Sequence, residues 1–169
     1  MHDHLYKKLN IHLDLHQFDQ IKMLDTIEFK TSPYDAKYIL PSQEVREYVG
    51  SKIPLPPAEN KQIIWQILKN PANTTYAMHV DAIRYSAINT LVSLPNPDHE
   101  FVMESDTTGK ITLDYNSTPG IPYLINVEQR HGVWNRSSTH NRYILTIGFF
   151  IKNYNYDFMA DWLAKCQLI

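Results

Sequence analysis

The sequence predicts a mainly β domain, a sandwich or barrel with jelly-roll connections, supported by helices at both ends of the chain. From residue 74 onward, short segments rich in β-branched and aromatic residues follow one another. Turn-forming residues separate these segments at intervals of about ten residues, which is typical of sandwiches and barrels. The last stretch, 155–169, instead shows the apolar spacing of a helix.

The core of the fold is expected between residues 74 and 151, in seven short strands. Each candidate strand is bounded by turn material such as PNPDHE, DTTGK, NSTPGIP or RSSTHN. Six or seven short strands at this spacing indicate a sandwich or a barrel with jelly-roll connections. The candidates are TTYAMHVD, YSAINTLVSL, EFVMES, KITLDY, PYLINVEQ, GVWNR and RYILTIGFFI.

The flanking regions, residues 1–73 and 152–169, are expected to supply helical or irregular support. The clearest helix lies in PSQEVREYVGSKI, where Ser42 suits the start and Gly50 suits the end. The segment KQIIWQILKN is compatible with either a buried strand or a short helix. In the C-terminal helix, an apolar stripe is expected to pack on the sheet, made of Phe158, Trp162 and Cys166.

Size and composition favour a single globular domain over residues 1–169. Apolar residues make up 43% and charged residues 20% of the chain, as in ordinary folded domains. A net charge of −2 gives no indication of a nucleic-acid-binding surface, which needs clustered basic residues. Nothing in the sequence indicates an oligomeric state.

The cellular location is expected to be the cytoplasm. Cys166 is the single cysteine, so no disulfide can form within the chain and a reducing compartment is the simpler interpretation. The N-terminus lacks the apolar segment of a signal peptide. The longest apolar run, 143–151, is too short to cross a membrane, so no membrane partner is expected.

One candidate strand carries an imidazole and a carboxylate two positions apart, at His79 and Asp81. Side chains at i and i+2 of a strand point to the same face, so these two are expected to project together. They would be either two ligands of a metal site or a hydrogen-bonded pair without further function. A third ligand elsewhere in the chain is needed to favour the metal site.

That third ligand is expected to be His131, at the start of a later strand, and Arg142 follows it by eleven residues. Two histidines and one carboxylate make the facial triad that holds Fe(II) and leaves three coordination positions open. A guanidinium nearby suits a carboxylate-bearing cosubstrate, because it binds carboxylates bidentately. His140 is the competing candidate for the third ligand, but it lies in a polar turn.

With these residues the sequence resembles the 2-oxoglutarate/Fe(II)-dependent dioxygenase family, over roughly residues 74 to 151. The resemblance rests on the order and spacing of the triad and of Arg142, in the contexts PYLINVEQRHGVWN and RYILTIGF. The closing segment is most similar to the aspartyl/asparaginyl and prolyl hydroxylase-like branches. The resemblance implies a double-stranded β-helix core, Fe(II) bound by His79, Asp81 and His131, and 2-oxoglutarate as cosubstrate.

The same resemblance implies a cosubstrate site around Arg142, which would hold the C5 carboxylate. Many relatives have a hydroxyl side chain two residues after this arginine, whereas this chain has Ile144. Thr146 and Tyr76 are the residues expected to replace that hydroxyl. Asn89 would either bond the C1 carboxylate or be a satisfied interior amide.

Several other polar residues have two interpretations each. Arg84 would cap the mouth of the site, although a solvated loop arginine is the commoner case. Asn126 and Asn135 would either orient His131 or serve at turns and strand ends. His99 is expected in a loop, and the N-terminal histidines lack the further ligands that a zinc site needs.

The function implied by the resemblance is a hydroxylase that uses Fe(II), O2 and 2-oxoglutarate and releases succinate and CO2. Its substrate would be a small molecule, an amino acid or a peptidyl side chain. Two alternatives stay open: a cupin-like metalloenzyme that does not use 2-oxoglutarate, and a binding module without catalysis.

Overall fold

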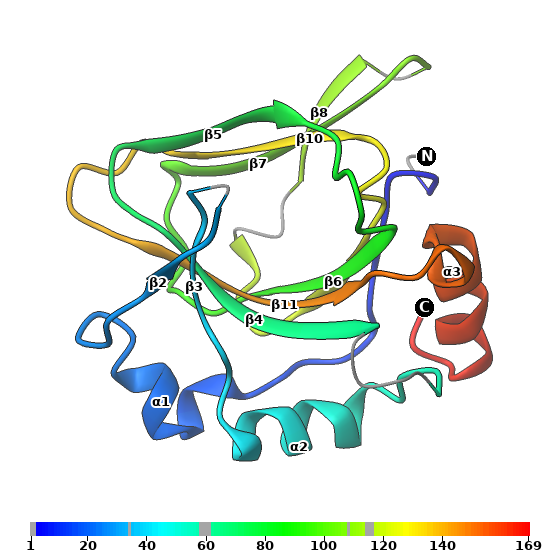
Figure 1. Ribbon diagram of the computed structural model, residues 1–169, viewed down its shortest axis with the longest axis horizontal. Helices are drawn as coiled ribbons and strands as arrows, with labels where there is room; N and C mark the ends of the chain where they lie inside the picture. The colour runs from blue at the N-terminus through cyan, green and yellow to red at the C-terminus, as the bar shows by residue number, and fades with distance from the viewer. Residues whose placement is uncertain (1–2, 34, 58–61, 108, 114–116) are drawn as a thin grey trace.

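The computed structural model describes residues 3–33, 35–57, 62–107, 109–113 and 117–169, and within them two antiparallel β-sheets pack face to face. Figure 1 shows the smaller sheet across the top and the larger sheet below it, with helices beneath and beside the larger sheet. This arrangement confirms the predicted mainly β architecture with helices from both ends of the chain.

The larger sheet has seven strands and the smaller sheet has four, within the described residues. In spatial order the larger sheet contains β1 (Tyr6–Lys8), β9 (Pro122–Ile125), β6 (Ser86–Leu91), β11 (Arg142–Phe149), β4 (Ile63–Asn70), β3 (Lys37–Ile39) and β2 (Lys30–Thr31). The smaller sheet contains β5 (Thr74–His79), β10 (Arg130–Asn135), β7 (His99–Ser105) and β8 (Gly109–Leu113).

The seven strands expected between residues 74 and 151 are all present, but the expected boundary of the core is wrong. Four strands from the first 73 residues, β1 to β4, join the larger sheet. β4 lies between β11 and β3 and pairs with β11 along its whole length, from Ile63 opposite Phe149 to Asn70 opposite Arg142. The ambiguous segment KQIIWQILKN is therefore a strand, because it fills the edge that β11 would otherwise expose.

β11 is buried on both faces, and its alternating residues belong to two different cores. Tyr143, Leu145, Ile147 and Phe149 pack against the N-terminal segments and the helices outside the sheet. Ile144 instead packs between the two sheets. Since side chains alternate across a strand, the residues at even-numbered positions of β11 face the interior of the sandwich.

The helices cover the outer face of the larger sheet (Figure 1). α2 (Gln43–Lys52) begins at Ser42, whose side chain accepts a hydrogen bond from the Val45 backbone, as predicted. It continues past Gly50, so the predicted stop at this glycine is wrong. The shorter helices of this region are η1 (Leu15–Gln17) and α1 (Asp19–Lys22).

The C-terminal region ends in α3 (Tyr156–Lys165), which follows η3 (Lys152–Tyr154). Its buried residues are Tyr156, Met159, Ala160 and Leu163. Of the predicted stripe, Trp162 and Cys166 are partly buried and pack against the same core, as expected. Phe158 is 39% exposed and stacks on Trp162, so the expectation is wrong for this residue. In the described part of the chain, no helix has the length and apolarity that crossing a membrane requires.

Candidate metal centre

The first two residues of the site come from the end of β5 and the connection that follows it. His79 is the last residue of β5, and Asp81 lies beyond the strand. The expectation that one strand holds both side chains is therefore wrong. The backbone N–H of Asp81 donates to the carbonyl oxygen of Val127, 3.2 Å away, and this bond ties the connection to the segment that leads into β10.

The third residue, His131, lies on β10 directly opposite His79 in the antiparallel register. A register shift between His131 and Val133 interrupts the pairing there. Gly132 lies inside the shift, where a Cβ atom would come within 3.0 Å of the Tyr76 carbonyl oxygen. The absence of a side chain thus lets the two strands approach closely beside the two imidazoles, whose ring planes are tilted by 53° to each other.

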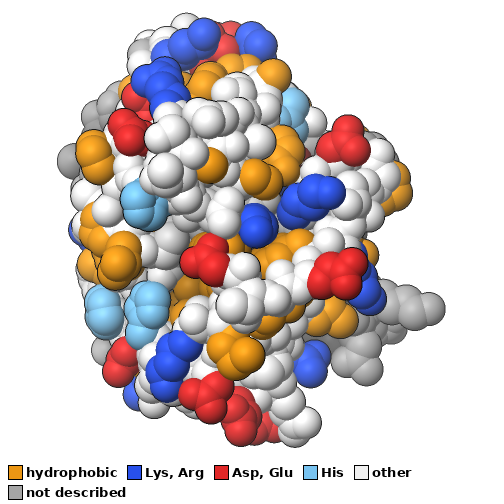
Figure 2. All heavy atoms as spheres, turned by 90° about the vertical axis from the view of Figure 1, so that its left-hand side faces the viewer, with side chains coloured by type: hydrophobic (Ala, Val, Ile, Leu, Met, Phe, Trp, Pro, Cys, Tyr) orange, Lys and Arg blue, Asp and Glu red, His pale blue; other side chains and the backbone are white. Residues whose placement is uncertain are grey.

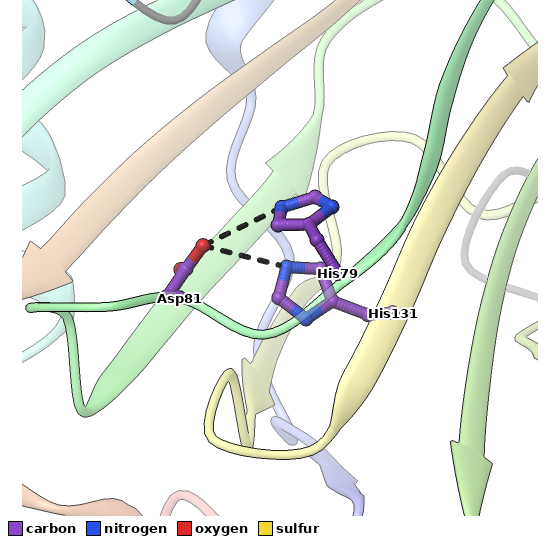
Figure 3. A group of neighbouring side chains, drawn as sticks. All are labelled: His79, Asp81 and His131. Atoms are coloured by element: carbon purple, nitrogen blue, oxygen red, sulfur yellow. Dashed lines mark ion pairs between the residues drawn. The ribbon is translucent and has the colours of Figure 1, made fainter.

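The three side chains converge on one point, as Figure 3 shows. One ligand atom from each of His79, Asp81 and His131 lies within 4.8 Å of the other two. Oδ1 of Asp81 is 3.5 Å from Nε2 of His79 and 3.8 Å from Nε2 of His131. The ring centroids of the two histidines are 4.4 Å apart. The triad expected from the sequence is therefore assembled in space.

The second nitrogen of each imidazole is already occupied by the backbone. Nδ1 of His79 lies 2.8 Å from the carbonyl oxygen of Ala77, and Nδ1 of His131 lies 2.9 Å from that of Gln129. A carbonyl oxygen can only accept, so both Nδ1 atoms carry the hydrogen when the rings are neutral. Both Nε2 lone pairs are then directed to Asp81 and are free to bind a metal.

The charges of the triad also suit a cation. Burial lowers the pKa of His131 to about 4, so this ring is neutral at physiological pH. Burial raises the pKa of Asp81, but the hydrogen bond that a protonated His79 donates and the charge of Arg84 outweigh this effect and bring it to about 2. The same bond, which Nε2 of His79 can donate only in the protonated ring, raises the pKa of His79. Two imidazoles and one carboxylate are donors typical of a non-heme iron site, so the residues present fit that metal.

Arg84 belongs to this site, contrary to the expectation of a solvated loop arginine. Its Nε atom lies 2.6 Å from Oδ2 of Asp81, and its side chain is 18% exposed. A bend at residues 82 and 83 brings it back to the carboxylate. Its spacing three residues after Asp81, in a segment that turns, was the signal in the sequence that could have found it.

Three of the four residues expected to bind the cosubstrate lie in the interior of the sandwich. Arg142 and Thr146 are 3% and 1% exposed, and both lie on the inner face of β11. Asn89 is opposite Thr146 in the register of β6 and β11. Its Oδ1 atom is buried without a hydrogen-bond partner among the described residues, and a buried amide of this kind normally has a partner or a ligand.

The fourth expected residue, Tyr76, is engaged elsewhere. Its hydroxyl lies 3.4 Å from the carbonyl oxygen of Asp35, in the connection between β2 and β3. Burial raises the pKa of this hydroxyl, so it is protonated and able to donate. A role for Tyr76 toward a cosubstrate stays a prediction.

The two asparagines near His131 do not orient it. Asn135 bridges the sheets, because its Nδ2 atom lies within 3.0 Å of the carbonyl oxygens of Asn70, Pro71 and His140. Asn126 bonds to the carbonyl oxygen of His4. The backbone of Gln129 holds His131 instead, a partner that no side-chain pattern could indicate.

The remaining histidines near the site are not among its ligands. Nδ1 of His140 lies 2.8 Å from Oγ1 of Thr139, so the choice of His131 over His140 agrees with the structure. His99 is 4% exposed at the start of β7, and the expectation of a loop residue is wrong. Burial and the nearby charge of Arg142 lower the pKa of His99, which places the two residues at the same end of the sandwich.

A polar hollow of about 430 Å³ is lined by residues that neighbour the triad in the sequence, although no triad residue is among them. Its lining includes Val80, between two of the triad residues, and Gln129 and Arg130, which precede the third. Figure 2 shows the end of the sandwich with the turns after β4 and β10, where acidic and basic side chains are interspersed. That face has no extended area of one charge.

No family model and no curated protein matches this sequence. Among solved structures, a prolyl hydroxylase from Trichoplax adhaerens, in complex with a hypoxia inducible factor peptide fragment, aligns with 86% of this chain and 83% of its own. The TM-score is 0.63 at 12% identity. A prolyl-4-hydroxylase from Pseudomonas putida aligns with 87% of this chain and 92% of its own, with a TM-score of 0.57 and 14% identity.

A third solved structure, a 2OG-Fe(II) oxygenase family oxidoreductase from Burkholderia pseudomallei, is matched over 64% of this chain at 14% identity. The chain spans 51% of the length of that protein, with a TM-score of 0.45. The two prolyl hydroxylases, by contrast, are matched over most of their length, at identities that establish similarity of fold. By its fold, this chain is therefore a jelly-roll protein similar to the 2-oxoglutarate- and Fe(II)-dependent oxygenases.

Proposed function

We propose that this protein is a 2-oxoglutarate- and Fe(II)-dependent dioxygenase that hydroxylates a C–H bond of a peptidyl side chain, an amino acid or a small molecule. One observation carries the proposal: two Nε2 atoms and one carboxylate oxygen meet at one point, and both Nδ1 atoms are held by backbone carbonyl groups. A hydrogen-bonded histidine–carboxylate pair without further function does not need a second imidazole beside it, held in a fixed orientation on another strand.

His79, Asp81 and His131 would hold the iron on one face. When bound, iron and 2-oxoglutarate supply the O2-dependent oxidation of the C–H bond, with release of succinate and CO2. Asp81 offsets part of the charge of the metal, and the low pKa of His131 keeps that ring neutral and able to bind. The backbone carbonyl groups at Ala77 and Gln129 keep both rings in one tautomer and one orientation.

Arg142 would bind the distal carboxylate of 2-oxoglutarate within the sandwich. The buried guanidinium remains charged and offers a planar pair of donors. Thr146 lies on the same inner face of β11 and would donate its hydroxyl, in place of the hydroxyl that Ile144 lacks. Asn89, with its unpartnered amide oxygen opposite Thr146, would border the same ligand.

The substrate would reach the metal from the side of His79. The His79 side chain is 49% exposed, whereas that of His131 is 5% exposed. Val80 and Ile83 beside it are exposed apolar residues, which suit contact with an extended peptide or an apolar side chain. The Trichoplax enzyme was solved with a peptide, and we infer by analogy that a peptidyl side chain is the substrate to test first. The cytoplasm remains the proposed location.

Anaerobic addition of Fe(II) and 2-oxoglutarate tests the proposal directly. A weak visible charge-transfer band is expected for the wild type and not for the His131→Ala variant. A cupin-like metalloenzyme would bind the metal without the band, and a non-catalytic binding module would bind neither. The substrate is then sought by measuring succinate formation from 2-oxoglutarate across free amino acids and peptides.

A further inference from the structure

Arg84 links the metal ligand Asp81 to the inner face of β11. On one side, Nε lies 2.6 Å from Oδ2 of Asp81 and leaves Oδ1 directed to the two imidazoles. On the other side, Nη1 lies 3.5 Å from Oγ1 of Thr146. The guanidinium thus stands between the metal site and the strand that carries Arg142.

The sequence makes room for this arginine on β11. A Cβ atom at position 148 would lie 2.8 Å from Cδ of Arg84 and would displace it, so glycine lets the aliphatic part of the side chain lie against the strand in its present position. Thr146 and Gly148 face the interior, on the same side of β11 as Arg142. Two guanidinium groups are therefore associated with one strand face, one near the triad and one at the beginning of the strand.

The charge of Arg84 changes what the triad can bind. The triad has one carboxylate to offset a divalent ion, and Arg84 is paired with that same carboxylate. The positive charge of the guanidinium repels the ion at short range through a partly buried medium, where charges are only weakly screened. A dianion bound beside Thr146 would be attracted by the metal and by the guanidinium together, and would remove this repulsion.

We propose that Arg84 couples the two binding steps: it makes tight metal binding dependent on an anionic cosubstrate that lies between Asp81 and Thr146. This inference rests on the proposed function, which supplies the dianion 2-oxoglutarate. Linkage requires the effect to be reciprocal, so the metal must strengthen cosubstrate binding by the same factor. Arg84 acts here as a positioning residue and as a fixed charge.

The alternative is that Arg84 only orients Asp81. Loss of an orienting residue would weaken metal binding equally with and without 2-oxoglutarate. Loss of a coupling charge would reduce the ratio between the two affinities. The ratio therefore separates the two roles, whatever happens to the affinity for the metal alone.

The experiment measures Mn²⁺ binding by EPR, with and without saturating 2-oxoglutarate, up to millimolar Mn²⁺ so that weak variants remain measurable. The coupling factor is the ratio of the Mn²⁺ affinity with 2-oxoglutarate to the Mn²⁺ affinity without it. In the wild type we expect this factor to be at least ten. In Arg84→Gln this factor should fall to a third or less of its wild-type value. Arg84→Lys, which keeps the charge but not the planar fork, should retain most of it.

Two further variants serve as control and as second test. Arg130→Gln removes an arginine next to His131 whose side chain is 59% exposed and pairs with Glu104; its coupling factor should equal that of the wild type. Gly148→Ala retains every charge but displaces the side chain of Arg84, and should lower the factor. Circular dichroism confirms that each variant is folded.

The outcomes separate this inference from the function on which it rests. An unchanged factor in both Arg84→Gln and Gly148→Ala would overturn the coupling role and leave the oxygenase proposal intact. If the wild type bound neither Mn²⁺ nor 2-oxoglutarate, the proposed function would fail, and the inference with it. If the coupling factor fell as much in Arg130→Gln as in Arg84→Gln, the effect would be a general one of positive charge. This result would also overturn the role of Arg84.

Discussion

Nε2 of His131 lies 3.8 Å from Oδ1 of Asp81, the same oxygen atom that faces Nε2 of His79. Asp81 lies in the connection after β5, and the bond from its backbone N–H to Val127 holds this connection beside the segment that leads to His131. One carboxylate oxygen that faces two imidazole nitrogens is an arrangement that suits a divalent ion.

His131→Ala should abolish specific metal binding. The variant removes the buried imidazole and leaves two donors on the more exposed side of the site, where water competes. A lost ligand should cost at least the roughly 100-fold in affinity that loss of a supporting partner can cost. The measurement is Mn²⁺ or Fe(II) titration. His140→Ala is the matched control, because His140 bonds within its own turn; equal losses in both variants would contradict the assigned ligand.

Arg142→Lys should weaken the binding of 2-oxoglutarate by about tenfold or more, a loss of about 1.4 kcal/mol in binding free energy. It should leave the affinity for the metal unchanged. Lysine keeps the charge but cannot make the paired bonds of a guanidinium to a carboxylate. Isothermal titration with 2-oxoglutarate in the presence of Mn²⁺ measures the effect. Arg136→Lys serves as the control, since its side chain is 63% exposed and pairs with Glu100. Parallel losses of metal and 2-oxoglutarate in Arg142→Lys would count against this role.

Asn135→Ala should destabilise the whole fold. The two N–H groups of this 1% exposed amide are shared among three carbonyl oxygens within 3.0 Å, and its Oδ1 atom accepts from the Ser137 backbone. Each buried polar group left without a partner costs about 1–3 kcal/mol, so the free energy of unfolding should fall by about 3 kcal/mol or more. Urea denaturation measures it. Asn126→Ala, which loses a bond to the exposed His4 backbone, should cost far less; similar costs would refute a special role for Asn135.

Stability in acid should depend on Asp25. Its hydrogen bonds from Tyr143 and Asn141 lower its pKa below the ordinary value of 3.8. The unfolded state then takes up the proton first, so the contribution of Asp25 is present above about pH 4 and is lost as pH falls through the folded-state value. The difference in urea midpoint between wild type and Asp25→Asn should therefore be largest near pH 7 and shrink toward pH 3.

Asp19→Asn is the control for this pH series. Asp19 pairs with Lys22 on the surface, its side chain is 89% exposed, and such pairs contribute little to stability. Its difference from the wild type should be small at every pH. A difference for Asp25→Asn that stayed constant from pH 7 to pH 3 would show that the lowered pKa has no thermodynamic consequence.

Local patterns predicted the strands well where turn residues bound them clearly. From β5 to β11, each strand appears where alternating or apolar segments lie between turns. β4 could not be assigned, because IIWQILKN has neither clear alternation nor helical spacing; its place between β11 and β3 decides its conformation. In α3 the predicted stripe holds only in part: Trp162 and Cys166 pack against the core, whereas Phe158 is exposed and Met159 and Leu163 are the fully buried residues.

By itself, the sequence determined which side chains are available: two histidines, an aspartate and an arginine, in an order and on segments that suit a jelly roll. The tertiary structure decided how they meet. The bonds of the two imidazoles to the Ala77 and Gln129 carbonyl groups and the return of Arg84 to Asp81 join residues only two or three positions apart. The pairing of His131 with His79 and the close approach at Gly132 instead join distant segments. No periodicity encodes these long-range contacts, because they form only when the two strands pair in this register.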